Sequence, residues 1–153
     1  MSKSRRHNSL IPLSHDHHHA LVLCLRIHRG LEKQRDEEGW LQSTAEGARQ
    51  FYESDLRPHF KIEEEVLFPA MRNFPKAPQL IEELLSEHRA LENLIGRLPQ
   101  IKGRGLEETL AQLADLLKAH IRKEENSLFP IYEKWIAETL ADKIGQEIKV
   151  RQK

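Results

Sequence analysis

The sequence contains little cysteine, glycine or proline, no long hydrophobic run and no excess of either charge. Its one cysteine, Cys24, cannot form a disulfide within the chain, which fits a reducing compartment. The 24 lysines and arginines balance the 24 aspartates and glutamates. The chain therefore has no net positive charge that would favour binding to a nucleic acid. No segment resembles a signal peptide or a membrane span. These absences predict a cytoplasmic protein without nucleic-acid or membrane partners.

Common catalytic and binding motifs are missing too, including a Gly-rich phosphate loop and a Cys-x-x-Cys pair. The 153 residues are enough for one domain with its own core. We expect a basic N-terminal tail over residues 1–9, carrying Lys3, Arg5 and Arg6, and a single helical domain over residues 10–153.

The few glycines and prolines lie between long periodic segments, a pattern typical of an all-α protein. Four long helices are predicted, over residues 14 to about 36, 43 to 71, 79 to 98 and 106 to 129, and a shorter terminal helix over 131 to 150. Residues 38–40 and 103–105 are expected to interrupt helical structure. Pro58 is expected to kink its helix without breaking it, because the apolar stripe continues past it.

One motif, His-x-x-x-Glu-Glu-x-x-Leu-Phe-Pro, occurs twice, beginning at His59 and at His120. In a helix, positions four residues apart share a face, so His59 lies beside Glu63 and His120 beside Glu124. Two such faces turned toward each other supply two imidazoles and two carboxylates. Iron, manganese and zinc all accept that mixed set.

These residues fall on the faces that the apolar pattern predicts to be buried. In the last long helix Leu117 precedes His120 and Leu128 follows Glu124, with steps of three or four throughout. His88 occupies the same kind of position in the third helix. Buried carboxylates without partners cost several kcal/mol each, so a metal pair is the expected compensation.

The first helix carries a histidine cluster from which one or two side chains can face inward. Alignment of the segment around His88 with residues 17–21 places His18 in register with His88, and this match is given slightly more weight. A helical wheel favours His17, which lies closer to the centre of the apolar stripe. Both remain candidates. The other histidines are expected to be surface residues: His7, His15, His19 and His28.

The order of these residues resembles the hemerythrin-like family, also called the HHE cation-binding domain, over residues 10 to 137. The resemblance implies an up-down-up-down four-helix bundle, followed here by the short C-terminal helix, with a non-haem di-iron centre between the helices. It implies two iron ions as cofactor, with manganese or zinc as alternatives. The metal ligands carried over are His17 or His18, His59, Glu63, His88, His120 and Glu124, with both glutamates as bridges.

The sequence departs from the oxygen-carrying members of this family. Four residues after His88 the chain has Glu92 instead of histidine, and Glu124 replaces an aspartate that lies five residues after the histidine. A harder, more anionic site favours ferric iron over reversible oxygen carriage. Glu92 could be a further metal ligand or a solvated acid on the helix surface, and the surface interpretation is slightly favoured. Glu64, Glu65 and Glu125 are likewise interpreted as a solvated acidic face.

Three functions are therefore considered. The first is a di-iron protein that senses or handles dioxygen, nitric oxide or iron, with a small diatomic molecule or peroxide as its ligand. The second is an oxidative enzyme that oxidises ferrous iron or decomposes peroxide at the same centre. The third is a zinc-binding or structural helical interaction domain. A monomer or a homodimer is expected in each case.

Overall fold

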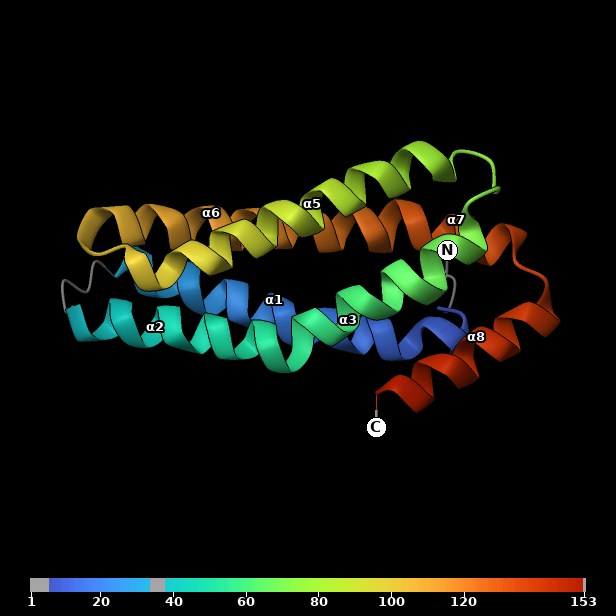
Figure 1. Cartoon of the computed structure of the whole chain (residues 1–153), viewed down its shortest axis with the longest axis horizontal. Helices are drawn as coiled ribbons and strands as arrows, with labels where there is room; N and C mark the ends of the chain where they lie inside the picture. The colour runs from blue at the N-terminus through green and yellow to red at the C-terminus, as the bar shows by residue number, and fades with distance from the viewer. Residues whose placement is uncertain (1–5, 34–37, 153) are drawn as a thin grey trace.

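The computed structural model of the chain describes residues 6–33 and 38–152, and all regular structure in these residues is helical. Four long rods run up, down, up and down, and a further helix folds back across one end (Figure 1). The rods are α1 (Ile11–Glu32); α2 (Glu38–Phe51), α3 (Arg57–Ile62) and α4 (Phe68–Met71) in series; α5 (Ala77–Arg97); and α6 (Gly103–Lys123) with α7 (Phe129–Trp135). The further helix is α8 (Glu138–Arg151). The predicted all-α bundle is confirmed.

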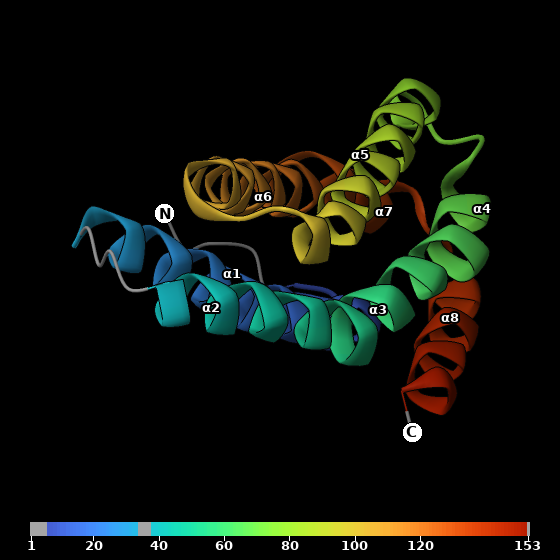
Figure 2. The same cartoon turned by 60° about the vertical axis from the view of Figure 1, so that its left-hand side comes forward.

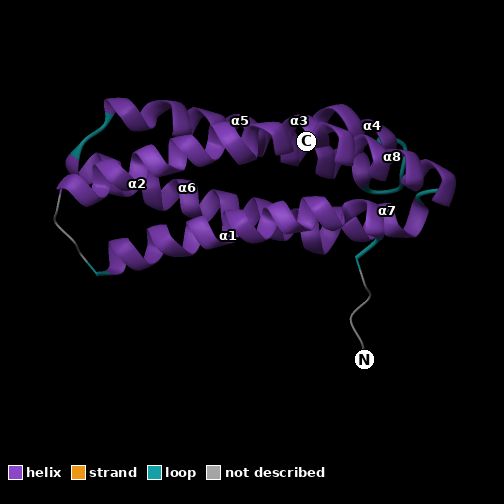
Figure 3. Ribbon diagram, turned by 90° about the horizontal axis from the view of Figure 1, so that it is seen from below, coloured by secondary structure: helices purple, strands orange, loops and turns teal. Residues whose placement is uncertain are grey.

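The rods surround a common axis in a fixed order. Helix α6 lies between α1 and α5, and the series α2–α3 closes the ring on the opposite side (Figure 2). The connections lie at the ends of the bundle, so the middle is formed by helices alone in the described part of the chain (Figure 3). None of the described helices combines the length and apolar character that a membrane crossing requires.

Three π-helical turns explain how the second and fourth rods pass their prolines. They span Tyr52–Leu56, Glu63–Leu67 and Glu124–Leu128, and each ends two residues before a proline. In each turn the residue before the proline donates its N–H to the carbonyl five positions back. Proline has no N–H, and its ring collides with the carbonyl four residues earlier, so a wider turn relieves the clash. Pro58 is therefore accommodated without a break, as expected.

Several predicted boundaries were wrong. The first rod begins at Ile11, and residues 38–40 start α2 instead of interrupting it. Gly103 opens α6 with a positive φ of 59°, and the rod that begins with α6 continues past Pro130 to Trp135 at the end of α7. The expected first-helix end at about residue 36 and the basic residues Lys3 and Arg5 lie outside the described part of the chain. Arg6, assigned to the tail, lies against the last rod, 2.9 Å from Glu133.

The core consists of two apolar clusters separated by a polar layer. One cluster contains Leu56, Leu91 and Leu117, and the other contains Leu67 and Leu84 with the inner face of α8. Between the two clusters each of the four rods contributes at least one buried histidine. Apolar side chains thus seal the polar layer from both ends of the bundle, which lowers the local dielectric and strengthens every charge interaction inside it.

Gly30 provides a test of how closely α1 and α2 approach each other. A Cβ at this position would lie 1.8 Å from Cζ2 of Trp40, whereas a Cβ at Gly47 would meet nothing within 4 Å. We predict that Gly30→Ala lowers the free energy of unfolding by about 1–3 kcal/mol because the indole has to move. Gly47→Ala, the matched control, should raise it by about 0.5–1 kcal/mol through helix propensity. Urea denaturation measures both, and a stabilised Gly30→Ala variant would disprove the close contact.

Candidate metal centre

Six polar side chains from four rods meet in the middle of the bundle. They are His17 on α1, His59 on α3, Glu63 in the π turn after it, His88 on α5, His120 on α6 and Glu124 in the π turn after that helix. All six are buried, and the two glutamates have no exposed surface. The ligand atoms form two groups, each within 4.8 Å: His17, His59, Glu63 and Glu124, and Glu63, His88, His120 and Glu124.

Both glutamates belong to both groups, with one carboxylate oxygen directed to each. Glu63 places Oε2 3.1 Å from Nε2 of His59 and Oε1 3.0 Å from Nε2 of His88. Glu124 places Oε1 2.9 Å from Nε2 of His17 and Oε2 3.0 Å from Nε2 of His120. Each carboxylate therefore presents one oxygen to each group and could help to hold a cation in both.

The contacts around Glu124 are close without being hydrogen bonds. Nε2 of His17, Nε2 of His120 and both carboxylate oxygens of Glu124 are buried and lack an aligned hydrogen-bond partner among the described residues. The nitrogen–oxygen distances are short, 2.9 and 3.0 Å, but the geometry is not that of a hydrogen bond. Buried polar atoms without partners cost about 1–3 kcal/mol each. A cation placed among them would satisfy these atoms together, so the donor set fits a metal pair.

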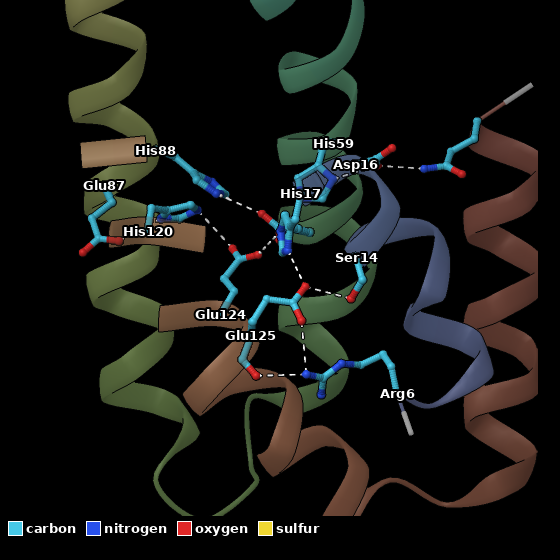
Figure 4. A network of polar contacts seen from close by, with 12 residues as sticks. Arg6, Ser14, Asp16, His17, His59, Glu87, His88, His120, Glu124 and Glu125 are labelled. Carbon is cyan, nitrogen blue, oxygen red and sulfur yellow. Dashed lines mark hydrogen bonds and ion pairs between the residues drawn. The ribbon is translucent and has the colours of Figure 1, made fainter. Parts of the chain in front are cut away.

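The outer nitrogen of every candidate ligand histidine is held by a second carboxylate. Figure 4 shows two of these pairs, His17 with Glu125 and His59 with Asp16. The four pairs, with their Nδ1–oxygen distances, are His17–Glu125 at 2.6 Å, His59–Asp16 at 2.8 Å, His88–Glu64 at 2.6 Å and His120–Glu87 at 2.8 Å. An Nδ1–H bonded to a carboxylate fixes the tautomer, leaving Nε2 as the inner donor. It also makes that nitrogen a stronger ligand.

These pairs form a closed ring around the bundle. Asp16 on α1 holds the histidine of α3, Glu64 beyond α3 holds that of α5, and Glu87 on α5 holds that of α6. Glu125, beyond α6, holds the histidine of α1 and completes the circuit. Each acid directly adjoins one of the six central residues in sequence, but the histidine that it binds lies on a different rod.

Further polar groups fix the outer carboxylates. Arg6 lies 3.1 Å from Glu125, Arg89 lies 3.0 Å from Glu64, and Lys123 contacts Glu87. Asp16 differs, because its partner is the neutral side chain of Gln152, at 2.9 Å. Burial raises the pKa of Glu64, Glu87 and Glu125, but the adjacent cations and imidazoles outweigh it and lower each below its ordinary value. The three acids therefore remain charged at neutral pH.

Aromatic rings complete the positioning and explain the repeated motif. Phe68 and Phe129, the phenylalanines of the two Leu-Phe-Pro segments, stack on His88 and His17 with interplanar angles of 21° and 13°. Phe60 also stacks on His88, with ring centroids 3.9 Å apart. In each copy the histidine and first glutamate face the centre. In the first copy the second glutamate and the phenylalanine both contact His88 on the next rod. In the second copy they both contact His17 on the first rod.

The inner carboxylates control the charge of the histidines. Burial lowers the pKa of His120, but Glu124 and Glu87 raise it to about 10. Burial also lowers the pKa of His59, and Glu63 and Asp16 outweigh it, leaving the value well above the ordinary one. Burial raises the pKa of Glu124, yet the imidazoles around it, His120 foremost, hold the value well below its usual range. A bound cation would take the place of the imidazole protons.

The structure separates the two candidates on the first helix. His17 is 4% exposed and lies in the buried series Leu13, His17, Ala20, Cys24, whereas His18 is exposed and outside both groups. The alignment that favoured His18 matched the Ala-Leu pair that follows the histidines. Matching the acid–histidine pairs, Asp16-His17 with Glu87-His88, identifies His17 from sequence.

The interpretation of Glu64 and Glu125 as solvated acids was wrong, because both hold ligand histidines. Glu65 is exposed and pairs with Arg151. Glu92 lies outside both groups, where it pairs with Arg89 at 3.2 Å and accepts a hydrogen bond from Tyr52 at 3.3 Å. The remaining histidines also lie outside both groups: His7, His15, His19 and His28.

Residues 11–132 match the hemerythrin HHE cation binding domain. The chain belongs to this family. All six buried donors and the acids that hold their outer nitrogens lie within the matched residues. The chain is thus an HHE-domain helical protein with buried histidine and glutamate groups suited to metal binding.

A stretch of 116 residues is 29% identical to a protein of Nostoc sp. (strain PCC 7120 / SAG 25.82 / UTEX 2576) named DNA nickase. The match covers 74% of this chain and 30% of that protein, so the chain spans less than a third of the length of this curated relative. No solved structure was found to match the chain.

Neighbouring glutamates allow a controlled test of the outer ring. Glu64 holds His88, whereas Glu65 is exposed and contacts none of the ligand histidines. We predict that Glu64→Gln weakens metal affinity about 10–100-fold, because His88 loses a charged acceptor. Glu65→Gln should leave affinity unchanged. Titration of metal-free protein with a competing chelator measures both, and equal affinities in the two variants would refute the positioning role.

Two adjacent histidines test the assignment on α1. We predict that His17→Ala reduces bound metal and the melting temperature together, because a buried donor is lost. His18→Ala, which changes an exposed side chain, should alter neither. Elemental analysis of protein purified without a histidine tag, combined with thermal denaturation, makes the comparison. Metal loss in His18→Ala alone would reverse the assignment.

Proposed function

We propose that this HHE domain is a non-haem di-iron protein that senses or handles dioxygen, nitric oxide or iron. The observation that supports it is the sharing of Glu63 and Glu124 between two groups of donors. Each group contains two imidazoles and two carboxylates, and each carboxylate directs separate oxygens to the two groups. A single metal ion would leave two of the histidines without a cation.

The donor chemistry favours iron, with manganese or zinc as alternatives. Structural zinc is usually held by tetrahedral sets rich in cysteine, and Cys24 lies outside both groups, packed in the apolar core. Imidazole and carboxylate together suit iron. An iron pair bound here would supply one-electron redox chemistry and positions for a small ligand. The chain would hold the pair in place, orient the imidazoles and exclude bulk water.

Space for a small ligand supports the functional part of the proposal. Each group offers four protein donors, whereas an octahedral metal ion accepts six. An ion held by either group would keep coordination positions open for a small ligand. A narrow cavity of about 10 Å³ borders His17, His59 and His120, close to the volume that one water molecule needs. That size excludes all but the smallest ligands, in keeping with a diatomic molecule rather than a larger substrate.

The departures from oxygen carriers bear on the role. Only His88 on α5 faces the centre, since Glu92 lies outside both groups, and the sixth donor is the glutamate at position 124. The resulting four-imidazole, two-carboxylate set supports the oxidised state of iron more than reversible oxygen binding.

An oxidative enzyme is the second candidate, and the cavity beside the histidines favours it as well. It would oxidise ferrous iron or decompose peroxide. Multiple turnovers of peroxide by the reduced protein would identify the enzyme, while a single reaction per centre would identify a sensor or carrier. The match covers only 30% of the Nostoc protein, so the nicking activity in that protein's name gives no basis for a role of this chain. The cytoplasmic location and the monomeric or homodimeric state stay predictions.

Metal analysis with an absorption spectrum tests the central proposal. Protein produced with ample iron should contain about two irons per chain, one for each donor group. It should absorb in the near ultraviolet and visible range when oxidised, lose that absorption on reduction and regain it in air. A colourless protein without stoichiometric metal would exclude the di-iron role, and one zinc per chain would favour the structural alternative.

Metal should also stabilise the fold through His120. Because ligand binding to the native state adds to stability, free metal at about 100 times Kd should raise the free energy of unfolding by about 2.7 kcal/mol. We predict that His120→Ala abolishes most of this increment, since its Nε2 is a buried donor. The readout is the difference in melting temperature with and without metal. An increment in His120→Ala equal to that of the unmodified protein would contradict the assignment.

A further inference from the structure

An open cleft lies on the surface beside the candidate centre. It has a volume of about 390 Å³ and lies between α1, the first π turn with α3, and the end of α8. Asp16, Asp55 and His59 line its inner side, and Arg151 and Gln152 of the α8 end line its outer side. The cleft is therefore the place where the chain's C-terminal helix end meets the first two rods.

The cleft and the narrow inner cavity share three lining residues. Asp16, Asp55 and His59 border both spaces, so one wall separates solvent from the donors. At its inner end the cavity reaches His17 and His120, which are 4% and 1% exposed. Their Nε2 atoms lack hydrogen-bond partners among the described residues. The shortest route from the surface to these unsatisfied donors therefore passes between the shared side chains.

Charge along this path favours a cation. Asp55 is exposed and accepts a hydrogen bond from the Ser54 hydroxyl, and it forms no ion pair within the described residues. One oxygen of Asp16 serves both His59 and Gln152. Two cationic groups of the described chain line the cleft, and both are already paired: Arg151 with two glutamates of its own, and the His59 imidazole with Asp16 and Glu63. Among the described residues Asp55 is left as an acid without an ion pair on a concave surface, and such a surface concentrates divalent ions from solution.

We propose that this cleft is the loading port through which a hydrated divalent metal ion reaches the centre. Asp55 is the first landing site, where its carboxylate replaces part of the hydration shell. The ion then passes Asp16, whose contact with Gln152 narrows the path, and reaches the Nε2 atoms of His17 and His120. This inference rests on the proposed function, because it needs a metal centre as its destination.

Loading kinetics test the port separately from the centre. Metal-free protein is mixed with Co²⁺ at low ionic strength, and the appearance of its absorption bands gives the loading rate. Asp55→Asn should slow loading about threefold to tenfold and leave the final cobalt content unchanged. Asp55→Lys should slow it further. Glu53→Gln is the matched control, because Glu53 is a nearby exposed acid already paired with Arg57 at 3.0 Å. It should load at the normal rate.

Salt provides a second readout. The difference between Asp55→Asn and the unmodified protein should shrink in about 1 M salt, where charges are screened within about 3 Å. Equal loading rates at low salt, with normal final cobalt content, would overturn the port while leaving the metal centre intact. A reduced final content in Asp55→Asn would also overturn it, because Asp55 would then belong to the equilibrium site. Failure of the unmodified protein to take up metal would remove the proposed function and the port together.

Discussion

The rest of the structure depends on two carboxylates, Glu63 and Glu124, that are completely buried in the middle of an apolar bundle. Transfer of such charges from water is costly by several kcal/mol each unless they are compensated. The four imidazoles, at 2.9–3.1 Å, offset part of that cost, and a cation among them would offset the remainder. Every other feature of the centre follows from this arrangement. Each rod has to deliver a polar side chain to one level, apolar clusters have to close that level above and below, and outer acids have to keep the imidazoles in place.

Much of the centre could be predicted from sequence because helical periodicity is a property of one segment at a time. Steps of three and four residues placed His59, Glu63, His88, His120 and Glu124 on buried faces, and the structure has all five there. The same reasoning failed at helix ends. Pro130 suggested that the fourth helix ends at residue 129, whereas a π turn lets that rod continue. Glycine near residue 39 suggested a break, whereas packing of Trp40 against α1 holds that segment in a helix. Tertiary contacts decided these boundaries.

The outer acids show what periodicity alone does not reveal. Glu64 and Glu125 lie away from the buried stripe of their own helix, and on an isolated helix such a position is solvated. Their partners belong to neighbouring rods, so their role depends on how the helices pack side by side. A sequence signal did exist. Each of the four acids directly adjoins a ligand residue, as Asp16 adjoins His17 and Glu87 adjoins His88. That pairing carried more information than the alignment of apolar residues around the histidines.

The ring of cross-rod contacts has a consequence for how the protein assembles. Isolated segments can offer only a histidine and a glutamate four residues apart, which is a weak chelate. Each imidazole acquires its orienting acid when the adjacent rod docks, and the circuit closes only when α6 reaches α1. The complete donor set, with every imidazole oriented, is thus a product of the finished topology. A partly folded chain lacks it, so any metal bound by this set would bind tightly only after the native bundle has formed.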